Sequence, residues 1–214
     1  MAMLRRAFVV CASALLILAG AAPIAYAGPA AFGGCSAQFY LGDPRLGPMR
    51  YPISGPVGRM LRGYNRTGRM SAEQLLTTYY DPWTGGWRYP PLDGYAIGSN
   101  GGPVRWTEHL MPGKRIDRFG GESGAFLAPA GLPYEARSIP PQDLVGSPPE
   151  SCGYHEYVVA RNFTVYAGPV SPWFFQPGGG LRFQLSAGLV DGVPPAADLT
   201  VKWLVDNGYL LRLR

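Results

Sequence analysis

Glycine and proline interrupt this chain so often that long helices are excluded. The 214 residues include 30 glycines and 22 prolines. Glycine weakens a helix through its backbone freedom, and proline does so because it lacks an N–H group and clashes with the preceding turn. A helical bundle therefore cannot account for the sequence, and short elements joined by many turns are expected.

Short runs of apolar and aromatic residues predict the strands, and these runs concentrate after residue 150. Each run is bounded by Gly, Pro or Asn, which is typical of strands that end in turns. The predicted strands are Tyr154 to Val159, Phe163 to Tyr166, Leu181 to Leu185 and Tyr209 to Leu213. We expect an α+β fold with a small, twisted, mostly antiparallel sheet, few short helices and an irregular N-terminal lobe.

Two helices are predicted from their capping signals. Ser71 and Gln74 fit a capping box, which opens a short helix that reaches about Thr78. Asp198 is the expected cap of a second helix, and Gly208 is expected to close it.

The N-terminus has the pattern of an export signal. Two arginines precede an apolar run over residues 7–22, and small residues at 25–27 offer a cleavage site. The run is short for a membrane span. We therefore predict a signal peptide at 1–27, a secreted product with no stable membrane insertion, a lobe at 28–110 and a domain at 111–214.

Cys35 and Cys152 remain once the leader, which contains Cys11, is removed. Two cysteines in an exported chain most simply form one disulfide. It would close a separation of 152 − 35 = 117 residues. A metal site would need His109 and His155 beside these cysteines, and the spacing of a zinc site is absent, so we expect no metal.

The basic residues are of a kind that favours a small anionic ligand. The chain has 19 Lys and Arg against 14 Asp and Glu, and the lysines are only Lys114 and Lys202. A nucleic-acid partner is therefore not expected. Arginine binds phosphate in a bidentate manner, and Arg118 and Arg137 stand near the aromatic Phe119 and Phe126. This set favours a nucleotide, with a structural salt bridge as the alternative for each arginine.

A serine hydrolase is disfavoured. Gly121 to Ala125 nearly spells a nucleophile elbow around Ser123, and Asp143 and His155 follow in the required order. The second glycine of the motif is replaced by Ala125, however, and no βαβ series surrounds the serine.

Six short motifs occur in a fixed order: Gly42 to Pro48, Ile116 to Pro129, Glu135 to Pro141, Tyr154 to Tyr157, Pro169 to Gly180 and Gly208 to Leu210. As an ordered set they resemble the secreted fungal NAD glycohydrolases, which share a catalytic domain with the tuberculosis necrotizing toxin (TNT). The resemblance implies that residues 111–214 form such a domain and cleave the bond between nicotinamide and ribose. NAD and NADP would be substrates, so no cofactor is expected.

The resemblance also implies roles for residues at matching positions. The catalytic positions are those of Arg118, Arg182 and His155, and the substrate-binding positions are those of Phe119, Phe126, Arg137, Gly179 and Gly180. Arg182 departs from the pattern, because the family carries a catalytic glutamine there. A guanidinium should repel a developing carbocation unless it turns toward a phosphate. Gln184, two residues on, would share the same strand face.

Four further expectations accompany the resemblance. A catalytically lapsed nucleotide-binding protein, an ADP-ribosyl cyclase variant and a structural secreted module remain alternatives to hydrolysis. Analogy with the fungal enzymes implies a homodimer through the N-terminal lobe. A toxin would require an immunity protein, which the sequence does not identify. No calcium site is expected, because an acidic C-terminal extension is missing.

Overall fold

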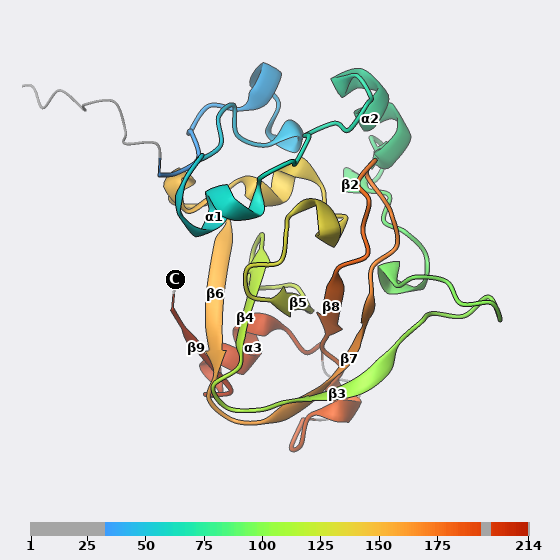
Figure 1. The fold of residues 1–214 in the computed structure, drawn as a ribbon, viewed down its shortest axis with the longest axis vertical. Coiled ribbons are helices and arrows are strands. Elements are labelled where there is room, and N and C mark those ends of the chain that lie inside the picture. Colours follow the sequence, from blue (N-terminus) through green and yellow to red (C-terminus); the bar gives the residue numbers. More distant parts are fainter. Residues whose placement is uncertain (1–32, 194–197, 214) are drawn as a thin grey trace, which may run out of the picture.

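The computed structural model describes residues 33–193 and 198–213, so the predicted signal peptide lies outside it. Its main element is a seven-stranded sheet in which every neighbouring pair is antiparallel. The strands, in spatial order, are β3 (Trp106–Leu110), β7 (Phe163–Pro169), β8 (Leu181–Gln184), β5 (Phe126–Pro129), β4 (Arg115–Phe119), β6 (Tyr154–Val159) and β9 (Leu210–Arg212). The sheet curls strongly (Figure 1). Its combination with short helices confirms the predicted α+β fold.

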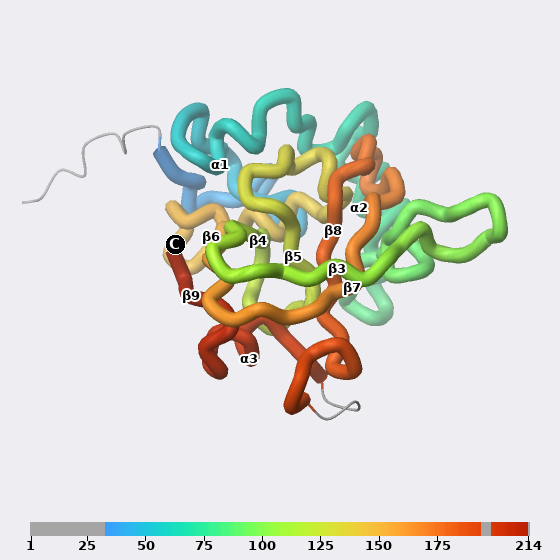
Figure 2. The backbone as a smooth tube through the Cα atoms, turned by 60° about the horizontal axis from the view of Figure 1, so that its bottom comes forward, coloured from blue at the N-terminus to red at the C-terminus, as the bar shows by residue number. Residues whose placement is uncertain are grey.

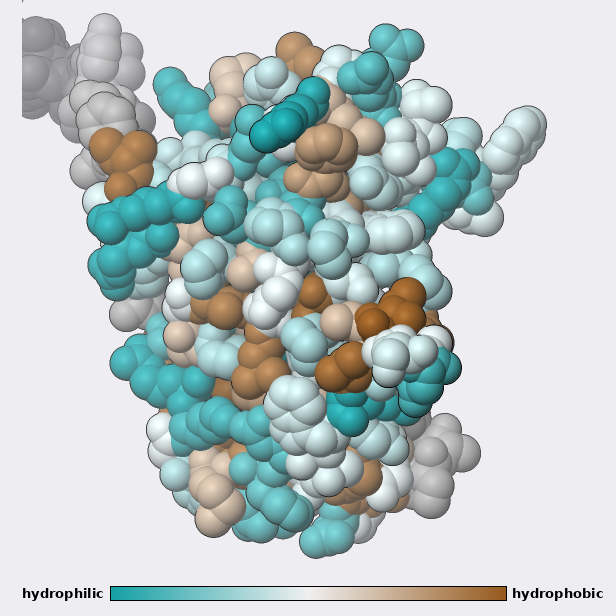
Figure 3. Space-filling model, turned by 45° about the vertical axis from the view of Figure 1, so that its right-hand side comes forward, coloured by the Kyte–Doolittle hydropathy of each residue, from teal (hydrophilic) through white to brown (hydrophobic). Residues whose placement is uncertain are grey.

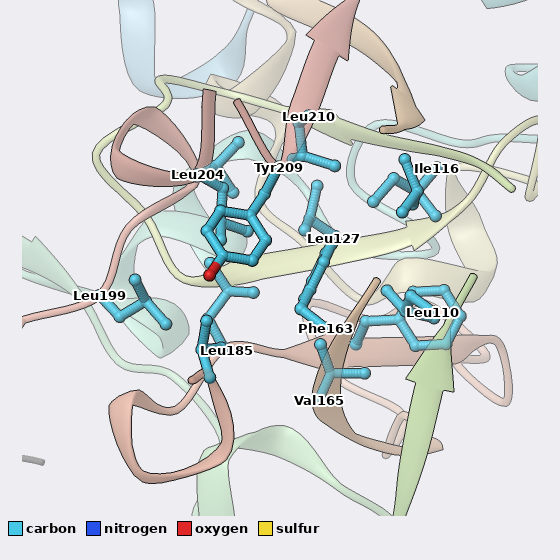
Figure 4. Close-up of a cluster of buried hydrophobic side chains, with 14 of the residues drawn as sticks. Leu110, Ile116, Leu127, Phe163, Val165, Leu185, Leu199, Leu204, Tyr209 and Leu210 are labelled. Atoms are coloured by element: carbon cyan, nitrogen blue, oxygen red, sulfur yellow. The ribbon is translucent and has the colours of Figure 1, made fainter. Parts of the chain in front are cut away.

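The larger apolar core lies against the sheet beside the C-terminal helix α3 (Val201–Asp206). Side chains from the inner strands meet Leu204 of α3 and Tyr209, which precedes β9 (Figure 4). Phe183, Val165 and Leu204 in this core are fully buried. Burial of each such side chain contributes about 1.5–3 kcal/mol, so this cluster holds the helix on the sheet.

The N-terminal lobe packs on the opposite end of the sheet (Figure 2). It contains α1 (Gly55–Met60), α2 (Ala72–Tyr79) and the short hairpin of β1 (Tyr80–Asp81) with β2 (Gly86–Trp87). Its apolar side chains share a second core with the sheet and with the loops that follow β5. The members of this core include Met60, Leu61, Phe119, Tyr134, Leu144 and Tyr154.

The disulfide between Cys35 and Cys152 is present, with the two Cα atoms 5.2 Å apart. Both cysteines are buried in the second core. The bridge therefore joins the start of the N-terminal lobe to the segment before β6, as the sequence predicts.

The strand predictions are confirmed after residue 150 and incomplete before it. β6 has its predicted bounds, β7 runs three residues further, and β8 and β9 are shorter than predicted. The five strands before residue 150, β1 to β5, are not predicted from the sequence. The polar residues around Arg118 predict a turn from the sequence, and this prediction is wrong, because Arg118 belongs to β4, which pairs with both β5 and β6.

The first helix cap is confirmed and the second is wrong by two residues. Ser71 Oγ accepts a hydrogen bond from the Gln74 amide, and Gln74 Oε1 accepts one from the Ser71 amide, which completes the capping box of α2. In α3, the cap is Thr200, whose Oγ1 accepts from the Trp203 amide at 3.1 Å. Thr200 and Asp198 can both cap a helix, and the sequence does not decide between them.

None of the helices in the described ranges has the length and apolar content to cross a membrane. The same ranges hold no group of three or more His, Cys, Asp or Glu side chains placed to bind a metal ion. Several large apolar side chains stay exposed, Trp83 most fully. Figure 3 shows apolar surface, in brown, gathered across the middle of one face.

Candidate active site

A cavity of about 440 Å³ opens between the N-terminal lobe and the sheet. The lobe contributes the segment 89–94, and the sheet contributes residues of β4, β5 and β8. The remaining wall includes Arg137, Ile139, Val170 and Asp143, which belongs to the 3₁₀ turn Pro141–Leu144. A cavity of this volume is in the range that holds a small organic ligand.

Arg118 extends from β4 into this cavity without an ion-pair partner. Its guanidinium donates to the carbonyl oxygen of Phe126 at 3.2 Å and, more weakly, to that of Gly120 at 3.4 Å. Among the described residues, no carboxylate oxygen lies within 4.0 Å of its nitrogen atoms. Burial lowers the pKa of this guanidinium, although an arginine remains charged in proteins. A half-buried cation without a carboxylate partner among the described residues favours binding of an anion.

The loop between β4 and β5 holds Arg118 in place. A Cβ atom on Gly124 would come within 2.7 Å of the Arg118 guanidinium, so a larger residue would displace it. The carbonyl groups of Glu122 and Gly124 accept hydrogen bonds from the first amides of α3, those of Lys202 and Val201. The helix therefore anchors the loop that shapes this side of the cavity.

Arg182 lies across the cavity on β8 and covers an aromatic ring. Its guanidinium carbon is 4.7 Å from the centre of the Phe126 ring, which is a cation–π distance. The same guanidinium donates to the backbone carbonyl of Asp93 in the lobe. A Cβ atom on Gly94 would overlap the guanidinium, so this glycine leaves room for it. Gln184, the alternative considered for this position, does not line the cavity.

Arg137 also lines the cavity, but its charge is already compensated. Its guanidinium donates to both carboxylate oxygens of Asp117, at 2.6 and 3.0 Å, and to the carbonyl of Leu132. Arg137 is 5% exposed and Asp117 is fully buried. The guanidinium carbon lies 5.1 Å from the ring centre of Phe119. A phosphate would have to compete with Asp117 for this arginine.

Phe119 and Phe126 differ in how far they reach the cavity. Phe126 is 37% exposed, whereas Phe119 is 4% exposed and packs edge-on against Tyr134. Phe126 is therefore the ring that a ligand can reach more easily, on the condition that Arg182 leaves part of its face open.

Asp143 is the acidic side chain in this cavity that lacks a partner. It lies on the 3₁₀ turn Pro141–Leu144, and no ion pair joins it to any described residue. Burial raises the pKa of its carboxyl group to about 7, and the charge of Arg118 opposes this rise. Such a shifted carboxyl group in a cavity is a frequent property of functional sites.

Comparisons with known proteins identify the family of this chain. The family profile for the tuberculosis necrotizing toxin matches residues 109–213. The conidial surface nicotinamide adenine dinucleotide glycohydrolase nadA of Aspergillus fumigatus is 38% identical over 184 residues, covering 82% of this chain and 71% of that protein. This chain belongs to the TNT domain family. It is therefore a homologue of an NAD glycohydrolase.

A solved structure shows that the fold of the family is shared. The tuberculosis necrotizing toxin, determined in complex with its immunity factor, superposes with a TM-score of 0.50 at 20% sequence identity. The match covers 66% of this chain and 71% of the toxin chain.

His155 lies beside Arg118 but outside the cavity lining. The two residues are paired in the register of β4 and β6. Burial lowers the pKa of His155. No hydrogen bond joins it to Ser123 or Asp143 in the described part of the chain, so a serine-hydrolase arrangement is not formed. Nearby, Glu122 accepts from Tyr157 and Arg212, and the bond from Arg212 is the main reason that its pKa falls to about 2.

Gly179 and Gly180 do not line the cavity. The Gly179 amide donates to Val170, and the Gly180 amide donates to Ala136. A Cβ atom on Gly180 would lie 2.6 Å from the Ala136 carbonyl oxygen. The glycine run is therefore a tight turn packed against the segment that carries Arg137.

Sequence reasoning missed the contribution of the lobe to the site. Tyr89, Asp93 and Gly94 form one wall of the cavity, and Asp143 was weighed only as part of a hydrolase triad. These residues belong to loops that lack a motif, and only the fold brings them to the strands.

Proposed function

We propose that this chain is an exported NAD(P) glycohydrolase that yields nicotinamide and ADP-ribose. One observation carries the proposal: Arg118 extends into a cavity and has no carboxylate partner in the described part of a chain whose family includes an NAD glycohydrolase. The pyrophosphate of a nucleotide would supply an anionic partner for this arginine. Guanidinium groups bind phosphate oxygens through charge-assisted hydrogen bonds.

The reaction requires little acid–base assistance. The nicotinamide ring of NAD carries a positive charge, so it departs as a neutral molecule once the bond from its nitrogen to ribose C1′ breaks. The electron pair of that bond stays on the ring nitrogen, and a water molecule adds to the ribosyl cation and loses a proton to solvent. The usual pair of glycosidase carboxylates is therefore not obligatory. The task of the protein is to bind the pyrophosphate and orient the ribose.

Four of the predicted residues, Arg118, Phe126, Arg137 and His155, then have a role in binding or support. Arg118 binds the pyrophosphate, and Phe126 provides an aromatic face for a base. Arg137 positions Phe119 through the contact between its guanidinium and the ring, and the ion pair with Asp117 holds Arg137 in place. His155 supports Arg118 from the adjacent strand.

A fluorescence assay with etheno-NAD tests the proposal. The purified chain should release fluorescent product, and Arg118→Ala should reduce kcat/KM by about 100-fold or more, since it removes the main anion contact. Arg161→Ala is a matched control, because that arginine follows β6, packs over the Tyr209 ring and does not line the cavity. Hydrolysis that survives Arg118→Ala unchanged would overturn the assignment.

One observation favours a second candidate, a nucleotide-binding protein that has lost catalysis. Arg182 stands where the family has a glutamine, and its guanidinium covers the Phe126 ring. This candidate predicts that the wild type binds ADP-ribose without hydrolysing NAD, and that Arg182→Gln gains hydrolysis. Activity in the wild type would exclude it.

Export, domain division and assembly form part of the proposal. The disulfide and a relative found on the conidial surface support an extracellular location. We place the catalytic domain at 111–214 and the supporting lobe at 28–110, which would mediate a homodimer. A toxin role would require an immunity protein, like the immunity factor that binds the tuberculosis toxin in its solved complex.

A further inference from the structure

Within residues 33–193 and 198–213, the carboxyl group of Asp143 has neither an ion-pair nor a hydrogen-bond partner. Two contacts fix the location of Asp143. Its amide donates to the Pro140 carbonyl, and its carboxyl group lies beside Gly120, which follows β4. A Cβ atom at Gly120 would approach Asp143 Oδ1 to 3.2 Å, so the absence of a side chain there leaves the carboxyl group its space.

The charged and titratable groups that face Asp143 come from three parts of the fold. Arg118 approaches from β4, and Tyr89 from the lobe segment that lines the cavity. The buried Tyr134 and the partly buried Tyr64 approach from the second core. None of these groups forms a hydrogen bond or ion pair with the carboxyl group in the described chain.

The cavity therefore holds a carboxyl group and a guanidinium that do not form an ion pair with each other. Asp143 and Arg118 both line it, yet no oxygen–nitrogen pair between them is within 4.0 Å. A carboxylate can only accept hydrogen bonds and a guanidinium can only donate them, whereas a hydroxyl group does both. A polyhydroxylated anion, such as the ribosyl phosphate part of a nucleotide, satisfies both groups at once.

We propose that Asp143 contacts the ribose of the bound dinucleotide: its carboxylate accepts hydrogen bonds from the ribose hydroxyl groups and stabilises the ribosyl cation. This inference rests on the proposed function. As the bond from C1′ to the nicotinamide nitrogen breaks, the electron pair leaves with nicotinamide and positive charge develops on the ribose. Asp143 stays ionised through the step, and water then adds to C1′ and releases its proton to solvent.

The charge balance of the cavity supports this role. Arg137 and Asp117 cancel one another, and Asp93 lies 3.7 Å from Arg105, which is outside the lining. This leaves Arg118 and Arg182 as positive groups and Asp143 as the unpaired negative group among the described lining residues. Two cations alone would oppose a developing cation, so a carboxylate is the group in this lining that can stabilise it. The pKa of Asp143, raised to about 7 by burial, means that its ionised fraction increases across neutral pH.

Steady-state hydrolysis of NAD by the full chain, from roughly pH 5 to pH 9, tests the inference. For wild type, kcat/KM should rise with pH through an apparent pKa near that of the carboxyl group. Asp143→Asn should lower kcat by about 100-fold and remove this rise. Asp206→Asn is the matched control, because Asp206 is an exposed residue of α3 paired with Lys202.

The readouts separate this inference from the proposed function. ADP-ribose binding by calorimetry and urea unfolding accompany the kinetics, so that a misfolded variant is recognised. A wild type that hydrolyses NAD and an Asp143→Asn variant with the same kcat and pH profile would overturn the role of Asp143 alone. A wild type that neither hydrolyses NAD nor binds ADP-ribose would overturn both.

Discussion

The buried pair of Arg137 and Asp117 should be among the largest single contributions to stability that one substitution can reveal. Arg137→Met keeps an apolar stem of similar length but removes the guanidinium. Asp117, which is fully buried, would keep only the Gly131 amide at 2.9 Å and the Tyr154 hydroxyl at 3.2 Å. Removing one partner of a buried pair costs about 3–5 kcal/mol, because the other charge is left uncompensated.

Urea unfolding of the oxidised chain at neutral pH measures this cost. Lys202→Met is the matched control, since it breaks an exposed pair with Asp206 whose side chains are 61% and 50% exposed. Such a surface pair contributes about 0–1 kcal/mol. The double variant Arg137→Met with Asp117→Asn should recover part of the loss, because no buried charge remains. If Arg137→Met costs no more than Lys202→Met, the interpretation of this arginine as a compensated structural group is refuted.

Three further predictions concern stability. Asp143→Asn should raise the free energy of unfolding relative to wild type, and this gain should grow as pH rises from 3.8 to about 7. The reason is that the wild-type carboxyl group ionises less readily in the folded state than in the unfolded state, whereas Asn does not ionise. The gain reaches at most about 4 kcal/mol above that pH range. A gain that is independent of pH in urea titrations would contradict it. Reduction of the Cys35–Cys152 bridge should lower the free energy of unfolding by about 4–5 kcal/mol, and equal urea midpoints with and without reductant would argue against this. Gly180→Ala should cost about 1–3 kcal/mol, because its Cβ would meet the Ala136 carbonyl; an unchanged thermal midpoint would count against the packed turn.

Local patterns were sufficient for several elements of this fold. The capping box at Ser71 specified the start of α2, and the aromatic and β-branched run of β6 gave its bounds. Both signals lie within a few neighbouring residues. The disulfide could also be predicted, because only two cysteines remain after the leader.

β4 was missed because its stability depends on distant residues. It carries Arg115, Asp117 and Arg118 within five positions, which reads as a polar turn. Asp117 is tolerated in a buried strand because Arg137, 20 positions later, compensates its charge. That pairing is visible only once the chain is folded.

The candidate site was also predictable only in part, because some of its residues are brought together only by folding. Arg118, Phe126 and Arg182 were identified through motifs, and the structure brings them to one cavity. Asp143 and the lobe residue Tyr89 come from loops with no pattern of their own, so their place beside Arg118 follows from the packing of the lobe on the sheet.

A crystal structure of the chain with ADP-ribose tests the central claim most directly. The account predicts pyrophosphate oxygens at hydrogen-bonding distance, about 3 Å, from the Arg118 guanidinium, with a ribose hydroxyl group against Asp143. ADP-ribose bound elsewhere on the surface, or an empty cavity at saturating ligand, would contradict it.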